Sequence, residues 1–101
     1  MQFAGFDWDS GNLERCQKHG VSVSAIESLF AGPVAVLPDD EHSLHEARFR
    51  AVGRTDEGRA VFVVFTLRGQ GDAILIRPIS ARYMHSKEIA VYEEQNPDIQ
   101  E

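Results

Sequence analysis

Hydrophobic and polar positions in the first third of the chain alternate at helical spacing. Asp9 or Ser10 can cap a helix that continues to Gln17, and Gly20 stands where a left-handed glycine commonly follows a helix end. The pattern therefore predicts a short first helix after the N-terminal segment.

A second helix is predicted directly after this glycine. Ser22 or Ser24 can cap it, and Gly32 followed by Pro33 stops it. Its apolar side chains fall three or four residues apart, at Ile26, Leu29 and Phe30. The two helices are therefore joined by a tight turn.

The remaining apolar segments have the pattern of β-strands. Residues 3–8 alternate apolar and polar side chains, and residues 34–37 form a brief β-prone stretch that ends at Pro38, before a polar loop. Three longer runs follow, at residues 48–54, 60–67 and 73–79. Glycine-containing turns of hairpin length separate these runs, which predicts an antiparallel meander.

Details of the three runs predict their places in the sheet. The middle run is apolar on both faces and is expected in the centre. Arg48, Arg50 and Arg54 share one parity, so one face of their strand is basic while the other packs. Pro78 cannot donate to a strand ladder, which places the last run at an edge or marks a bulge.

The C-terminal part predicts a third helix and completes the fold class. Residues 86–94 carry Ile89 and Tyr92 three positions apart among charged residues, as in an amphipathic helix that lies on a sheet. The predicted order is one strand, two helices, four strands and one helix. Helices on one face of a small antiparallel sheet make an α+β fold, and residues 1–101 are expected to form a single domain.

Cysteine content and charge distribution indicate the cellular compartment and the kinds of ligand that the protein can bind. Cys16 is the only cysteine, so no intrachain disulfide can form and a reducing compartment such as the cytoplasm is expected. No apolar run approaches the roughly 18 residues of a membrane span. The net charge of −6 argues against a nucleic-acid ligand, but seven arginines and three acids between Arg48 and Arg82 give a local charge of +4. Such a region can face RNA or an acidic partner, or consist of solvated arginines.

Three blocks of sequence resemble the BrnT family of RelE-like toxins. They run from Trp8-Asp9 to Cys-Gln-Lys-His-Gly-Val-Ser at 16–22, from Arg48-Phe49 to Gly53-Arg54, and from Ile-Ser-Ala-Arg at 79–82 to Lys87-Glu88 and Tyr92. The blocks occur in the family's order over nearly the whole chain. The Lys-His-Gly-Val and Ile-Ser-Ala-Arg blocks are fairly specific as a pair.

The resemblance implies a ribonuclease toxin of a bacterial type II toxin–antitoxin pair, with a RelE-like α+β fold. It implies an endoribonuclease that acts without a metal or another cofactor. The implied partners are RNA and a BrnA-like antitoxin with a ribbon-helix-helix DNA-binding region. Operator DNA would be bound only through this antitoxin, and no membrane partner is implied.

Metal-independent RNA cleavage needs a base for the 2′-hydroxyl proton, an acid for the leaving 5′-oxygen, and cations beside the phosphorane. Lys18 and His19 are the best local candidates, because a histidine titrates near neutrality and a lysine can hold phosphate. Both residues can instead satisfy the carbonyls at a helix end. These two interpretations stay open.

Arginines and one acid complete the candidate site. Arg54 and Arg82 end or follow strands, where they can reach a shared cleft and bind phosphate, or form an ion pair with an acid such as Glu88. Glu46 is a candidate base, with a solvated loop position as the alternative. The predicted catalytic residues are Lys18, His19, Glu46, Arg54 and Arg82, and the predicted RNA-binding residues are Arg48, Arg50, Lys87 and Tyr92.

Other candidate groups have simpler interpretations. His42, His45 and His85 lack the further ligands and fixed geometry of a zinc site. Tyr92 can be a core residue with its hydroxyl at the rim, and Cys16 is expected to be buried rather than nucleophilic. Two other functions fit the same arginines: an inactive toxin-like module that only docks an antitoxin or another acidic partner, and a structural domain with solvated arginines.

Overall fold

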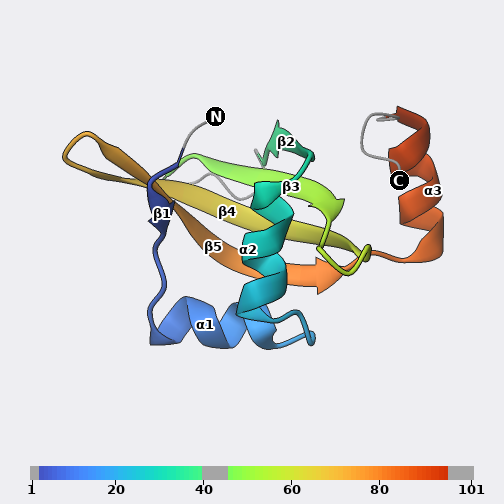
Figure 1. Cartoon of the computed structure of the whole chain (residues 1–101), viewed down its shortest axis with the longest axis horizontal. Coiled ribbons are helices and arrows are strands. Elements are labelled where there is room, and N and C mark those ends of the chain that lie inside the picture. Colours follow the sequence, from blue (N-terminus) through green and yellow to red (C-terminus); the bar gives the residue numbers. More distant parts are fainter. Residues whose placement is uncertain (1–2, 40–45, 96–101) are drawn as a thin grey trace.

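The computed structural model describes residues 3–39 and 46–95 and builds them around one β-sheet (Figure 1). In chain order the elements are β1 (Gly5–Phe6), α1 (Ser10–Gln17), α2 (Val23–Ala31), β2 (Val34–Pro38), β3 (Arg48–Arg54), β4 (Ala60–Gln70), β5 (Ala73–Tyr83) and α3 (Ser86–Gln95). The predicted α+β class is confirmed. The predicted polar loop before β3 falls mostly within residues 40–45, outside the described residues.

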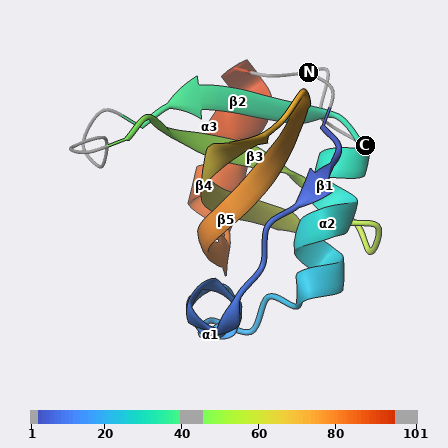
Figure 2. The same cartoon turned by 90° about the vertical axis from the view of Figure 1, so that its left-hand side faces the viewer.

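The sheet is mixed, because its first strand is parallel to its last. The strand order is β1-β5-β4-β3-β2, and β2 to β5 form the antiparallel meander. β1 pairs with β5 through Gly5 with Leu75 and Phe6 with Ile76 (Figure 2). The expectation of a purely antiparallel sheet is therefore wrong at this strand. β1 follows the direction of β5 and supplies backbone partners to an edge that would otherwise stay open, including a bond of 2.8 Å from Asp7 N to Ile76 O.

β4 lies in the centre of the sheet, as its two apolar faces predict. The β4–β5 hairpin is longer than expected, because β4 continues past the predicted end at residue 67 to Gln70 and the turn consists of Gly71 and Asp72. Gly71 has a φ of +64°, the left-handed conformation that tight two-residue turns require.

A bulge in β5 confirms one of the two interpretations of Pro78. Adjacent residues of β4 pair with Ser80 and Pro78, so Ile79 is an extra residue in the ladder. The extra residue reverses the alternation of side chains along β5. As a result Ala81 points into the core, where it is 2% exposed, and Arg82 points to the other face.

The core lies between the sheet and the helices α1 and α2. Its largest fully buried hydrophobic side chains are Phe65, Ile26, Leu29, Ile76, Val21, Val61 and Val63. Both helices begin at predicted caps: the Asp9 carboxylate accepts from the backbone of Gly11 and Asn12, and the Ser22 hydroxyl accepts from Ala25 N. The caps orient the two helices so that their apolar sides cover the sheet.

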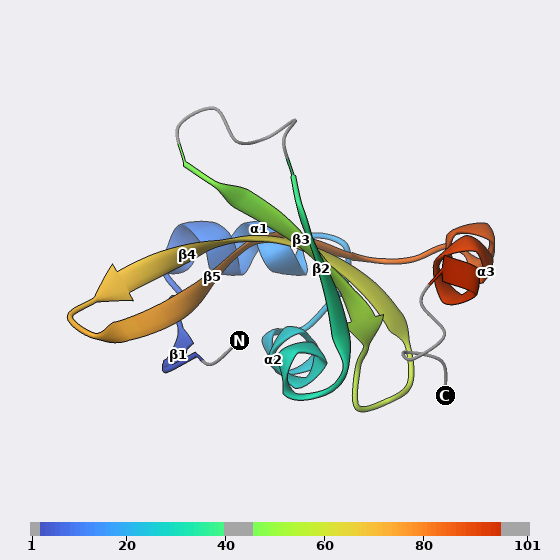
Figure 3. The same ribbon diagram turned by 90° about the horizontal axis from the view of Figure 1, so that it is seen from above.

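α3 lies beyond the end of the sheet, away from α1 and α2 (Figure 3). Its Tyr92 lines a groove with Val52 and Phe62, whereas the preceding residues Ala51 and Val61 are fully buried in the core. Because alternate residues of a strand face opposite sides, α3 packs on the face that α1 and α2 leave uncovered. The expectation that all helices share one face is wrong for α3, since α1 and α2 already fill the core face.

Candidate functional site

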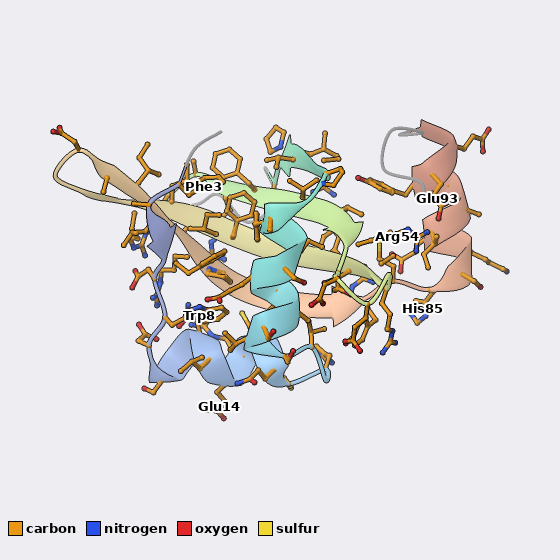
Figure 4. All side chains as sticks on the ribbon, in the orientation of Figure 1. Phe3, Trp8, Glu14, Arg54, His85 and Glu93 are labelled. Atoms are coloured by element: carbon orange, nitrogen blue, oxygen red, sulfur yellow. The ribbon has the colours of Figure 1, made fainter. Side chains whose placement is uncertain are left out.

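Arginines from three strands lie on the open face of the sheet, which we define as the face opposite α1 and α2. In β3 they alternate with core residues such as Ala51, which confirms the predicted basic face of that strand. The open-face arginines are Arg48, Arg50, Arg54, Arg68, Arg77 and Arg82. Figure 4 shows the side chains and labels Arg54 next to Glu93 of α3.

Carboxylates balance much of this positive charge. Arg82 donates two hydrogen bonds to the Glu88 carboxylate, at 2.9 and 3.0 Å. The other pairs are Arg54 with Glu93, Arg68 with Glu46, and Arg77 with Asp7 and Asp9. The ion pair that the sequence allowed as the alternative for Arg82 is therefore present, and its partner is Glu88.

The Arg82–Glu88 pair ties β5 to the first turn of α3. Glu88 also accepts a hydrogen bond of 3.0 Å from the backbone N–H of His85. The Arg82 guanidinium lies 4.8 Å from the centre of the Phe62 ring. The hydrogen bonds from Arg82, followed by that from His85, lower the pKa of Glu88 to about 2. The structure thus holds Arg82 in one orientation at the edge of the groove beside α3.

The groove beside α3, called the α3 groove below, has a volume of about 450 Å³. Its apolar lining includes Leu37, Val52, Phe62 and Val91. Arg50, Lys87 and Tyr92, three of the four predicted RNA-binding residues, also line it. The fold therefore brings together residues from β3 and α3 that lie far apart in the sequence.

Arg50 retains donor capacity in the α3 groove. Its Nη2 donates one long bond of 3.4 Å to the carbonyl of Pro38, and its Nε is buried without a hydrogen-bond partner among the described residues. Lys87 is exposed on the other side of the groove. Two cations over an apolar floor can hold a phosphate while Phe62 or an aliphatic side chain contacts a base.

Tyr92 anchors α3 to the sheet. Its hydroxyl donates a hydrogen bond of 2.8 Å to the carbonyl of Val52, and burial raises the pKa of the phenol. The ring lies between helix and sheet while the hydroxyl is at the rim, which matches the packing interpretation of this residue. The hydroxyl proton of Tyr92 is therefore already donated to the carbonyl of Val52.

Glu46 precedes β3, and neither Glu46 nor Arg48 lines the α3 groove. The hydrogen bond from Arg68 lowers the pKa of Glu46, which makes this carboxylate a weaker base. Arg68 and Phe62 are six positions apart in β4, or roughly 20 Å along an extended strand. The structure therefore does not bring Glu46 to Arg82, which pairs across the strands with Phe62.

Lys18 and His19 lie at the end of α1, on the helix-covered side of the sheet. Both are exposed, and Gly20 follows them with a φ of +88°. Within residues 3–39 and 46–95, neither side chain donates a hydrogen bond to the carbonyls at the helix end. Neither residue lines the α3 groove.

Sequence reasoning missed two residues at the end of the sheet. Arg59, in the β3–β4 turn, lies with its guanidinium carbon 3.5 Å from the centre of the Tyr83 ring. Glu93 pairs with Arg54 although 39 positions separate them. No local pattern indicates either contact, because both depend on how the strand ends and α3 meet.

Metal-binding clusters and membrane-spanning helices are absent from the described part of the chain. It contains no group of three or more His, Cys, Asp or Glu side chains placed to hold a metal ion. His42 and His45 lie outside the described residues. No helix in residues 3–39 and 46–95 is long and apolar enough to cross a membrane.

The sequence matches a known protein family over most of its length. A model of ribonuclease toxins of type II toxin–antitoxin systems, the BrnT toxins, matches residues 8–88. The match extends from Trp8, before α1, to Glu88, the partner of Arg82. Comparison with curated proteins found no match. The chain belongs to the BrnT family of ribonuclease toxins of type II toxin–antitoxin systems.

Proposed function

We propose that this BrnT-family protein is an endoribonuclease that cuts RNA internally without a metal ion. The observation that carries the proposal is the α3 groove, where Arg50 and Lys87 flank an apolar floor. Cations that contact phosphates and apolar or aromatic side chains that contact bases are the two elements of single-strand RNA recognition. Arg48, on the same face of β3, extends the proposed contact with the RNA backbone.

The proposed chemistry relies more on charge stabilisation than on one strong base. Arg54 and Arg82 are oriented by carboxylates, and an oriented guanidinium can stabilise charge on a phosphorane. Glu46 has a lowered pKa, and Lys18 and His19 do not line the groove. We keep Lys18, His19 and Glu46 as proposed catalytic residues that must be tested separately from the groove.

We also propose a cognate BrnA-like antitoxin as the partner that neutralises the toxin in the cytoplasm. The family is defined by type II toxin–antitoxin systems, in which a protein antitoxin is the partner. In this proposal the antitoxin carries the ribbon-helix-helix region, and operator DNA is bound through it alone. The RelE-like fold and the single domain over residues 1–101 belong to the same proposal.

A specific observation favours a second function, an inactive module that only docks an antitoxin. Arg54 and Arg82 already have carboxylate partners in Glu93 and Glu88, so their charge is offset before any RNA binds. A protein that only docks a partner does not need these guanidinium groups free. The two functions differ in whether the protein alone cuts RNA.

The test combines expression in a bacterial host with cleavage of a circular RNA by purified protein. Only an endonuclease opens a circle, and EDTA removes divalent metal ions. We expect growth arrest, loss of cellular RNA and opening of the circle in EDTA. The double variant Arg50→Ala, Lys87→Ala is expected to lower the cleavage rate at least about tenfold, because two phosphate contacts are lost.

Two further variants locate the chemistry. The double variant Lys18→Ala, His19→Ala tests the end of α1, and Arg15→Ala, which removes an exposed cation of α1, is the matched control. Cleavage that depends on Lys18 and His19 but not on Arg50 and Lys87 would move the site to the α1 side. Normal growth and intact RNA at confirmed abundance would support the inactive module instead.

A further inference from the structure

A second cleft lies between the β3–β4 turn and the start of α3. Its volume is about 400 Å³, within the range of small-ligand sites. Arg54 lines it from the end of β3 and Arg59 from the turn, while Tyr83 lines it from the end of β5 and Ser86 and Ile89 from α3. Of the described residues, only Met84 lines both this cleft and the α3 groove, so the two sites are adjacent but distinct.

An arginine stacked on a tyrosine forms one wall of the cleft. The guanidinium carbon of Arg59 lies 3.5 Å from the centre of the Tyr83 ring, as close as stacked planar groups approach. Tyr83 in turn packs against the hydrophobic core, so the ring has a fixed support. The two side chains together present a planar, positively charged surface.

The β3–β4 turn holds Arg59 in place. The Thr55 hydroxyl accepts hydrogen bonds from the backbone of Glu57 and Arg59, and Thr55 N donates to the carbonyl of Arg59 at 2.9 Å. Gly58 adopts a φ of +82°, and its carbonyl accepts a bond of 2.9 Å from Arg54 Nη1. The stacked arginine is therefore positioned by a turn whose backbone is closed by several hydrogen bonds.

Arg59 differs in charge balance from its neighbours. Arg54 and Arg82 each pair with a carboxylate of α3. Arg59 is exposed, and its guanidinium has no carboxylate partner within residues 3–39 and 46–95. Its in-plane N–H groups and its outer face are available to a ligand that carries both negative charge and a flat ring.

We propose that this cleft binds one nucleotide of single-stranded RNA. The base stacks on the outer face of the Arg59 guanidinium, which the Tyr83 ring backs, and the guanidinium edge donates hydrogen bonds to the adjacent phosphate. Met84 and Ile89 provide apolar contact at the side of the cleft. The inference rests on the proposed function only in taking RNA as the ligand.

The experiment measures binding rather than cleavage. The full chain is titrated into a fluorescent 2′-O-methyl oligonucleotide, which cannot be cut because its 2′-hydroxyl is blocked, and anisotropy is recorded. Arg59→Ala is expected to weaken binding about 5- to 100-fold, the range for loss of one stacked base. Arg15→Ala, an exposed arginine of α1, is the matched charge control and is expected to change binding less than twofold at about 0.15 M salt.

Arg59→Lys and Tyr83→Phe separate stacking from charge. Lysine keeps the charge but has no planar group that can stack, so we expect Arg59→Lys to lose most of the RNA affinity. Phenylalanine keeps the aromatic ring, so we expect Tyr83→Phe to retain the affinity. Full affinity in Arg59→Lys would show that only charge matters and would overturn the proposal. Competition by inorganic phosphate as strong as that by a nucleoside monophosphate would overturn it as well.

The outcomes separate this inference from the proposed function. If the protein binds the oligonucleotide through Arg59 but never opens circular RNA, the nucleotide site stands and the endoribonuclease proposal fails. If the protein opens the circle and Arg59→Ala changes neither binding nor cleavage, the nucleotide site fails and the endoribonuclease proposal stands.

Discussion

The side-chain amide of Asn12 in α1 donates a hydrogen bond of 2.9 Å to the carbonyl of Pro78 in β5. The same Nδ2 donates to the carbonyl of Asp7 at 2.9 Å, and Oδ1 accepts from Asp9 N at 2.7 Å. Asn12 is fully buried. One amide thus joins the start of α1 to the bulge that turns Arg82 onto the open face.

Asn12→Ala is expected to destabilise the protein. The substitution leaves the buried carbonyl of Pro78 and the part-buried carbonyl of Asp7 without this donor, and a buried unsatisfied group costs about 1–3 kcal/mol. The free energy of unfolding from urea titration measures the loss. Gln17→Ala removes an exposed amide of the same helix, which donates a hydrogen bond to Leu13 O, and should change stability by less than about 0.5 kcal/mol. Equal effects of the two variants would contradict the role of Asn12.

Gly53→Ala is expected to destabilise the contact between β3 and the α2–β2 connection. An added Cβ would lie 2.9 Å from the carbonyl oxygen of Pro33 and 3.4 Å from the Leu29 side chain. Overpacking of this kind costs about 1–3 kcal/mol, measured as a lower midpoint of urea unfolding. Gly69→Ala, in β4, meets no atom within 4 Å and serves as the control, which should unfold at the wild-type midpoint or above.

The Arg82–Glu88 pair is expected to contribute stability that depends on pH. The folded pKa of Glu88, about 2, lies below the value near 4.3 of an unfolded glutamate, so the contribution is present above pH 4.3 and is lost as pH falls towards 2. Both side chains are partly exposed, at 41% and 36%, which limits the effect to about 0.2–1 kcal/mol.

Unfolding of Glu88→Gln at a series of pH values measures this contribution. We expect the variant to be less stable than the wild type at pH 7 and the difference to shrink between pH 4.3 and 2, because the wild-type carboxylate becomes neutral there. A stability difference that stays constant over this pH range would mean that Glu88 stabilises the protein through packing rather than through its charge.

Cys16 is expected to resist alkylation in the folded protein. Burial raises the pKa of its thiol to about 11, so at pH 8 only about one molecule in a thousand carries the reactive thiolate, and the side chain is 0% exposed. Mass spectrometry after iodoacetamide treatment should show little adduct in buffer and complete modification in denaturant. Rapid labelling of the native protein would mean that α1 opens readily from β5.

Features that depend on residues close together in the chain could be predicted from the sequence. Capping at Asp9 and Ser22 follows from side chains that bond within the next three residues, and the central place of β4 follows from its two apolar faces. Pro78 indicated a bulge because it lacks an N–H, although an edge position remained possible. The BrnT resemblance also came from sequence blocks, and the family match confirms it.

Contacts between residues far apart in the chain could not be predicted and were found only in the folded structure. It placed β1 parallel to β5, put α3 on the open face, and paired Arg54 with Glu93 across 39 positions. It also left Lys18 and His19 outside the lining of the α3 groove. Helical and strand periodicities indicate which side of an element is apolar, but they do not indicate which face of the sheet a helix covers. The ion pairs of the arginines depend on which helices and strands lie next to each other, so these pairs could be identified only from the fold.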